Sequence, residues 1–191
     1  MTLPAADEVI AFWFGDPPSE APRAEWFKKD AAFDEQIRQR FGARVEEALG
    51  GGLRAWDATP TGALARIVLL DQFTRNLFRG TARSFAGDSL ALAAAQAMVA
   101  RGDDRWLSGV MRWFVYLPFE HSEDLAVQAE SLRLFARLSA DHPKLADGEV
   151  WAKKHEVIIA RFGRYPHRNE VLGRVSTPEE LAFLKEPGSS F

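Results

Sequence analysis

The stretch DAAFDEQIRQRFGARVEEALGGG, residues 30–52, indicates the fold class of this chain. An apolar residue recurs at every fourth position, at Phe33, Ile37, Phe41, Val45 and Leu49. This spacing puts the side chains on one face of an α-helix, whereas a half-buried strand would alternate with a period of two residues. Asp30 is suited to cap the N-terminus, and three glycines end the segment. The stretch therefore predicts an amphipathic helix packed against a core.

The rest of the chain repeats this pattern of a capping residue, a helical apolar period and a terminal glycine or proline. The predicted helices span residues 7–15, 59–80, 88–102, 103–118, 122–143, 147–163 and 177–188. The residues expected to cap them include Thr59, Asp88, Ser122 and Thr177. No segment alternates as β-strands require. We predict an all-α fold, a single helical domain over residues 1–191 with about eight helices.

Length and composition agree with one folded domain. The chain has 191 residues, of which 47% are hydrophobic and 27% are charged. The absence of cysteine excludes disulfides, thiolate nucleophiles and cysteine-ligated zinc. The first residues, MTLPAADEV, lack the pattern of a signal peptide, and no apolar stretch approaches the roughly 18 residues that cross a bilayer. We therefore expect a cytoplasmic protein that is not bound to a membrane.

Positive charge is concentrated in two segments of an otherwise acidic chain, whose net charge is −3. Residues 61–90 contain four arginines against two aspartates, and residues 161–175 contain four arginines against one glutamate. The acidic remainder argues against nucleic acid as a partner. The two basic segments favour a local site for an anionic small molecule.

The sequence DQFTRNLFR, residues 71–79, is the first candidate site. On a regular helix its polar side chains share one arc of about 140°. They are Asp71, Gln72, Arg75, Asn76 and Arg79. The preceding residues 63–70 are apolar nearly all round, which is typical of a buried helix. The polar stripe then faces the interior or a cleft, with Asp71 as the local partner of Arg75. An ordinary amphipathic surface helix is the alternative.

The sequence PFEHSED, residues 118–124, is the second candidate. His121 beside Glu123 and Asp124 suggests a general base oriented by a carboxylate, or a set of metal ligands. Gln128 shares a helix face with Asp124. The alternative is a capping role, in which the acids interact with the helix dipole. His155, on an apolar helix face, is predicted to be a core residue.

The sequence RFGRYPHRN, residues 161–169, is the third candidate. Gly163 is suited to end the preceding helix, and nearby arginines suit the negative end of its dipole. His167, Arg168 and Asn169 are not explained in this way. Arginines bind carboxylates and phosphates through two parallel hydrogen bonds, so Arg164 and Arg168 could hold an anion. They could equally cap helix C-termini or neutralise Glu123 and Asp124.

These motifs together resemble an uncharacterised bacterial family catalogued as domain of unknown function 924. The resemblance is carried by LLDQFTRNLFRGTARSFAGD (69–88), YLPFEHSEDLAVQ (116–128) and KHEVIIARFGRYPHRNEVLGRVSTPEELAFL (154–184). IAFWFG (10–15) and EWFKKDAAFD (25–34) fit it as well. The resemblance implies a tetratricopeptide-like α-α superhelix, although no 34-residue repeat can be aligned. It implies no established activity, and it transfers no catalytic residue.

Three functional hypotheses remain open at this level. In the first, the motifs converge on a pocket for an anionic small molecule, with His121, Glu123 and Asp124 as catalytic candidates and no assigned metal. The ligand-binding candidates are Asp71, Gln72, Arg75, Asn76, Arg79, Gln128, Arg164, His167, Arg168 and Asn169. The second hypothesis is a non-catalytic helical module that binds a peptide or partner protein. The third is a buried network that only fixes the fold. The sequence does not decide catalysis, cofactor or oligomeric state.

Overall fold

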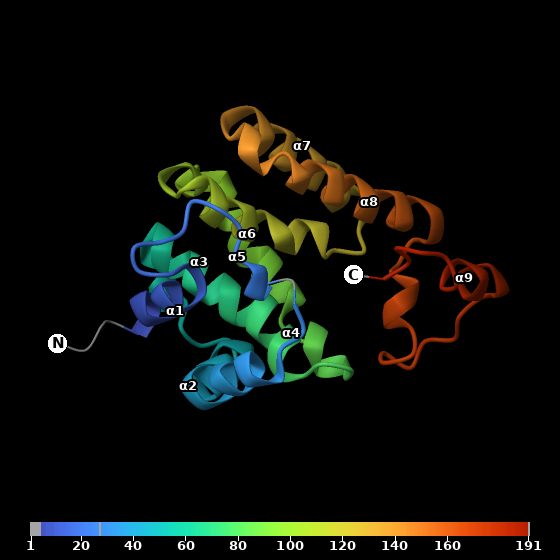
Figure 1. Ribbon diagram of the computed structural model, residues 1–191, viewed down its shortest axis with the longest axis horizontal. Helices are drawn as coiled ribbons and strands as arrows, with labels where there is room; N and C mark the ends of the chain where they lie inside the picture. The colour runs from blue at the N-terminus through green and yellow to red at the C-terminus, as the bar shows by residue number, and fades with distance from the viewer. Residues whose placement is uncertain (1–4, 27, 191) are drawn as a thin grey trace.

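A computed structural model describes residues 5–26 and 28–190, and this part of the chain is helical and contains no strand. The helices are α1 (Ala5–Phe14), α2 (Ala31–Leu49), α3 (Pro60–Val68), α4 (Thr74–Leu77), α5 (Asp88–Arg101), α6 (Gly109–Glu120), α7 (Leu125–Asp141), α8 (Asp147–Phe162) and α9 (Pro178–Phe183) (Figure 1). A π-helical segment, η3 (Leu69–Phe73), joins α3 and α4 into one rod. The predicted all-α fold with about eight helices is confirmed.

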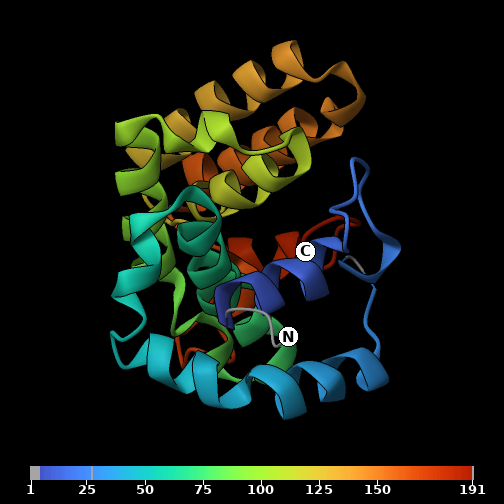
Figure 2. The same cartoon turned by 90° about the vertical axis from the view of Figure 1, so that its left-hand side faces the viewer.

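The helices form two groups with a C-terminal segment beside them. Helices α1 to α5 make up one group, with α2 lying along its outer side (Figures 1 and 2). Helices α6, α7 and α8 pack on one another in chain order. This order is consistent with the tetratricopeptide-like superhelix that the resemblance implies. None of the described helices combines the length and apolar character needed to cross a lipid bilayer.

The buried apolar side chains form a large and a small cluster. The large one is centred on aromatic residues of both helix groups, among them Trp13, Phe41, Phe73 and Phe119. The small one contains Ile158, Ile159 and Tyr165, with Phe162 and Phe183 packed against it. The C-terminal segment, residues 163–190, is therefore held to the end of α8 by a small apolar cluster that the two share.

Several helix ends follow the sequence prediction. Asp30 accepts hydrogen bonds from the backbone of Ala32 and Phe33, and Thr59 accepts one from Gly62. Gly163 ends α8 in the left-handed conformation, with φ of 69°. Thr177 forms a capping box with Glu180. Each side-chain cap is typically worth about 1 kcal/mol.

Other ends differ from the prediction. Asp124, not Ser122, caps α7, because its carboxylate accepts hydrogen bonds from the first turn. The predicted helix 103–118 is a short turn followed by α6, which Ser108 caps and which continues through Pro118. A proline in the last turn removes only one backbone hydrogen bond from the ladder.

The N-terminus of α5 also differs, and it is held against η3 by an unusually close backbone contact. Gly87, not Asp88, is the N-cap, and it makes no side-chain cap. A Cβ atom built on Gly87 would lie 2.1 Å from the carbonyl oxygen of Leu70. Only a residue without a side chain fits there. This approach brings Asp88 next to the π-helical segment. Its carboxylate does not cap α5 but accepts hydrogen bonds from Arg75 and Arg168.

Candidate functional site

The π-helical segment η3 places Asp71 inside the molecule. π-helical turns occur often at functional sites. One carboxylate oxygen of Asp71 lies 2.6 Å from Nδ1 of His121 and 3.2 Å from Nη1 of Arg75. Gln72 donates a hydrogen bond to the other oxygen. Both oxygens of this buried carboxylate are therefore engaged, and residues from the first and second sequence motifs meet at it.

Asp88 links two arginines that are far apart in the sequence. Arg75 donates from both terminal nitrogens to Asp88, at 2.8 and 3.1 Å. Arg168 donates a longer hydrogen bond, of 3.3 Å, to the same carboxylate. Asp88 has 21% of its side chain exposed. The C-terminal segment is thus joined to α4 and α5 by one carboxylate between two guanidinium groups, and this junction opens to solvent at Asp88.

The guanidinium group of Arg168 packs between two aromatic rings but has few hydrogen-bond acceptors. Its guanidinium carbon lies 4.5 Å from the ring centres of both Phe85 and Tyr165. Only 8% of its side chain is exposed, and its buried Nε has no hydrogen-bond partner among the described residues. Burial, followed by the charge of Arg75, lowers the pKa of Arg168 from its usual value. A buried cation in this state is costly unless an acceptor is supplied.

The end of α6 forms the wall beside these charges. Gln128 is fully buried and donates hydrogen bonds to the backbone oxygens of Glu120 and Ser122 and to the hydroxyl of Tyr165. Tyr165 in turn donates to the backbone oxygen of Glu120. Oε1 of Glu120 lies 3.0 Å from Nδ1 of His155, while Oε2 is buried and has no partner in the described part of the chain.

Burial sets the charges of these groups. It raises the pKa of Glu120 well above the ordinary value, and the nearby charge of Asp71 adds to the effect. It also favours a raised pKa for Asp71, but His121, Arg75 and hydrogen bonds hold that pKa well below its usual range. Burial and then Arg75 lower the pKa of His121. At neutral pH, Asp71 is therefore ionised, whereas Glu120 and His121 are neutral.

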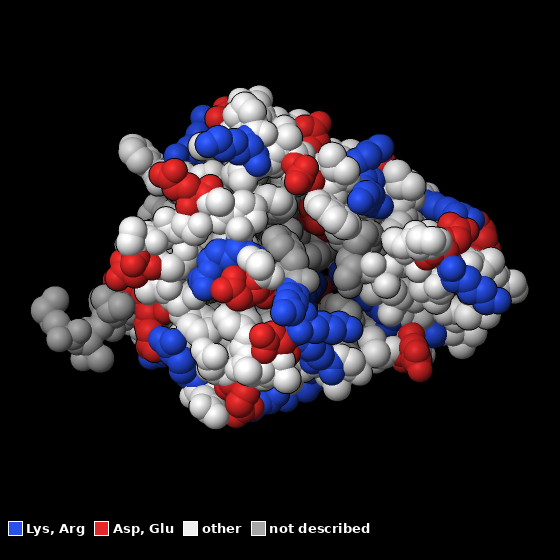
Figure 3. All heavy atoms as spheres, in the orientation of Figure 1, with Lys and Arg blue, Asp and Glu red and all other residues white. Residues whose placement is uncertain are grey.

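These residues form an arginine–histidine cluster. It contains Asp71, Gln72, Arg75, Phe85, Asp88, Glu120, His121, Tyr165 and Arg168. Acidic and basic side chains are interspersed on the face shown in Figure 3, and basic side chains gather beside α4 at the rim of a hollow facing the C-terminal segment. The cluster unites candidates from all three sequence motifs.

Replacing Glu120 by glutamine should change how stability depends on pH. The folded protein keeps a proton on Glu120 that the unfolded chain loses above about pH 4.5, so this contribution is complete below that pH and is lost as the pH rises. Relative to the wild type, Glu120→Gln should therefore gain unfolding free energy between pH 4.5 and 8 in urea titrations.

Glu123→Gln provides a control of opposite sign. Burial favours a raised pKa for Glu123, but hydrogen bonds from Arg174 and the backbone of Tyr165 lower it. This glutamate stabilises the protein above its unfolded pKa, and the contribution is lost as the pH falls. The unfolding free energy of Glu123→Gln should therefore fall further below that of the wild type as the pH rises. Parallel curves for wild type and Glu120→Gln would contradict a neutral Glu120.

Two predicted ligand-binding residues of the first motif lie outside the cluster. Asn76 donates to Asp34 of α2 at 2.7 Å, and Arg79 binds the same carboxylate with two hydrogen bonds. The predicted common arc assumed a regular helix through residue 79. The π-helical segment and the end of α4 at Leu77 break that regularity.

The acids of the second motif are engaged away from His121. Glu123 binds Arg174 at 2.6 and 3.0 Å and accepts a hydrogen bond from the backbone of Tyr165. Asp124 caps α7. The carboxylate that contacts His121 is Asp71, from a different helix, instead of either neighbour in the sequence.

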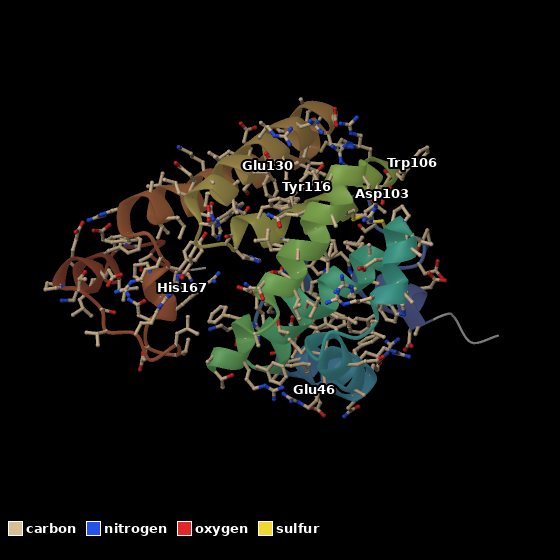
Figure 4. The ribbon with its side chains drawn as sticks, turned by 180° about the vertical axis from the view of Figure 1, so that it is seen from behind. Glu46, Asp103, Trp106, Tyr116, Glu130 and His167 are labelled. Carbon is tan, nitrogen blue, oxygen red and sulfur yellow. The ribbon has the colours of Figure 1, made fainter. Side chains whose placement is uncertain are left out.

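The third motif is divided between the cluster and the structure of the C-terminal segment. Arg164 binds Glu180 at 2.6 and 2.8 Å, and Asn169 contacts Ser176 and Arg174. His167 lies where this segment faces the rest of the molecule (Figure 4). It lines a pocket of about 510 Å³ with Pro166, Glu170, Arg174, Ser176, Leu181 and Leu184. Burial and then Arg168 lower the pKa of His167 to about 4.

Sequence reasoning missed four members of the cluster. The sequence around Asp88 predicts a helix cap, and Phe85, Glu120 and Tyr165 carry no sequence signal for a site. The excess of arginine over acid in residues 61–90 favours a site for an anionic small molecule, but it does not identify Asp88. His155 is buried, as predicted, although it lies beside Glu120. Across residues 5–26 and 28–190, no three histidine or acidic side chains are arranged to hold a metal ion.

These features define an all-helical protein whose charged cluster joins its N-terminal helices to its C-terminal segment. The chain belongs to the family of bacterial proteins of unknown function DUF924, which matches residues 9–188. It is similar to a solved structure of a protein of unknown function, ATU0120 from Agrobacterium tumefaciens. The two are 39% identical with a TM-score of 0.85, over 94% of this chain and 96% of that one. No curated protein matches the sequence.

Proposed function

We propose that this protein binds an anionic small molecule at the arginine–histidine cluster, with Arg168 as the principal anchor. The proposal includes a cytoplasmic location, which the cysteine-free sequence favours. The observation that carries it is the incomplete hydrogen bonding of Arg168. Its single contact with Asp88 is long, and its buried Nε lacks a partner among the described residues. A carboxylate or phosphate oxygen would supply the missing acceptor.

The surroundings of Arg168 support this role. Phe85 and Tyr165 fix the plane of the guanidinium group, so little side-chain entropy is lost when an anion binds. Arg75 adds a second positive charge at the same carboxylate. The charges of Arg75 and Arg168 are balanced by those of Asp71 and Asp88. An anion that binds therefore displaces water from a site without net negative charge.

The alternative of a peptide-binding module has weaker support. Such a module presents a continuous exposed apolar surface. The exposed large apolar side chains of the described residues are spread over several elements, and the most exposed tryptophan, Trp106 at 83%, lies at the opposite end of the molecule from His167 (Figure 4).

Arg168→Met is the direct test. Methionine keeps apolar contact with Phe85 and Tyr165 but removes the charge. We expect inorganic phosphate, succinate or another small carboxylate to raise the melting temperature of the wild type. The variant should bind that anion about 10- to 100-fold more weakly in titration calorimetry, because hydrogen bonds to charged groups contribute about 1.5–3 kcal/mol.

Arg83→Met is the matched control, since it removes the same charge from an exposed arginine paired with Glu46. It should leave anion binding unchanged, and ligand-free Arg168→Met should keep near-wild-type stability. If Arg168→Met alone unfolds several kcal/mol more easily, or if no anion of the panel binds through Arg168, the cluster is a structural network.

A further inference from the structure

The contact between Asp71 and His121 has the geometry of an oriented general base. Nδ1 of His121 lies 2.6 Å from the ionised carboxylate of Asp71, so the neutral imidazole carries its proton on Nδ1. Nε2 is then an acceptor, and it has no hydrogen bond to any described residue. The His121 side chain is 14% exposed, which leaves the ring in reach of a bound molecule.

Asp71 is itself held firmly. Gln72 and Arg75 both donate to it, and the π-helical segment fixes its backbone. A carboxylate fixed in this way selects one tautomer of the histidine and stabilises the imidazolium that forms when Nε2 takes a proton. Arg75 also joins this pair to Asp88 and thereby to the proposed anion anchor, Arg168.

Glu120 lies behind this pair, away from solvent. It precedes His121 in the chain, and its Oε2 is buried without a partner among the described residues. His155 packs between the two: its ring centre is 6.2 Å from that of His121, and its Nδ1 is 2.9 Å from the backbone oxygen of Trp151 and 3.0 Å from Glu120. Because burial raises the pKa of Glu120, this group is neutral and adds no negative charge beside the imidazole.

We infer that the protein catalyses a redox-neutral proton-transfer reaction on the bound anion, with His121 as the base that takes and returns the proton. This inference rests on the proposed function, because Arg168 would hold the carboxylate or phosphate of the substrate. Nε2 takes a proton from the substrate or from a water that attacks it. The imidazolium of His121 then gives that proton to the substrate atom that receives the released electron pair. The histidine returns to its starting state, and the reaction needs neither an oxidant nor a reductant.

The reactivity of His121 can be measured without knowing the substrate. Diethyl pyrocarbonate acylates unprotonated imidazole nitrogens, and peptide mass spectrometry gives the rate at each of the four histidines. We expect His121 to react faster than His142, which lies at the end of α7 outside the cluster. Asp71→Asn should slow His121 by about 10-fold or more, because Asn no longer holds the reactive tautomer.

Glu123→Gln is the matched control, since it neutralises the nearby acid that does not contact His121, and it should leave the rate unchanged. Nitrogen NMR of the wild type gives a second reading that does not depend on folding of a variant, and it should find the proton of His121 on Nδ1. A proton on Nε2, or a His121 that reacts more slowly than His142, would overturn the inference.

Protection separates this inference from the proposed function. Inorganic phosphate or succinate should protect His121 from acylation in the wild type but not in Arg168→Met. If His121 is reactive but no anion protects it, anion binding at Arg168 is wrong. If an anion binds through Arg168 while His121 is inert, the protein is a binding protein and the catalytic inference fails.

Discussion

Asp88→Ala is expected to lower the free energy of unfolding by about 3 kcal/mol, a large loss for one aspartate. The variant would leave both Arg75 and Arg168 beside each other without their shared carboxylate. Their mutual repulsion and the uncompensated burial of charge both oppose folding. Removing one partner of a buried ion pair costs about 3–5 kcal/mol of unfolding free energy. Because Asp88 is partly exposed, we expect a loss at the lower end of that range.

Urea denaturation of three variants tests this account. Glu46→Ala also removes an arginine-bound carboxylate, but Glu46 is 55% exposed, and the expected loss is below about 1 kcal/mol. Adding Arg168→Met to Asp88→Ala should restore part of the stability, because one unpaired cation is removed. Equal losses for Asp88→Ala and Glu46→Ala, or a double variant less stable than Asp88→Ala, would show that the bridging role is wrong.

Gly87→Ala is expected to cost about 3 kcal/mol as well, for a steric reason. The new methyl group would overlap the carbonyl oxygen of Leu70, which belongs to a buried backbone segment that cannot rotate away. Either η3 or the start of α5 must move. Because Asp71 lies in η3 and Asp88 follows Gly87, this shift should also weaken anion binding in calorimetry.

Gly42→Ala is the control for this substitution. Gly42 lies inside α2, and nothing stands within 4 Å of the position its Cβ would take. Alanine should therefore raise the unfolding free energy by about 0.5–1 kcal/mol, through its better helix propensity. A small effect of Gly87→Ala in the same urea experiment would mean that α5 and η3 can separate easily.

Much of the fold could be predicted from the sequence, because its signals are local. The period of apolar residues in α2, the Thr177 capping box and the left-handed Gly163 all depend on residues within one or two turns. The errors at Ser122 and Asp88 arose where two nearby polar residues compete for one cap, or where an acid has a stronger partner elsewhere. Such competition is decided by tertiary contacts.

The candidate site was predicted in part. Asp71 and Arg75 were paired correctly because they are four residues apart, and Arg168 stood out because no local role explained it. The contact between His121 and Asp71 spans 50 residues and depends on a π-helical turn, which leaves no periodic signal. Asp88 looked like an ordinary helix start, since its two arginine partners lie 13 residues before it and 80 residues after it.

The small apolar cluster that joins the C-terminal segment to α8 has a consequence for the order of folding. The contact between Asp88 and Arg168 joins residues 80 positions apart, so we expect it to form after α6, α7 and α8 have come together. The described contacts across this junction are mainly polar, so we expect residues 163–190 to open as a cooperative unit before the main core unfolds. Hydrogen exchange would then be faster in this segment than in α3, and a bound anion would slow it by joining the two parts.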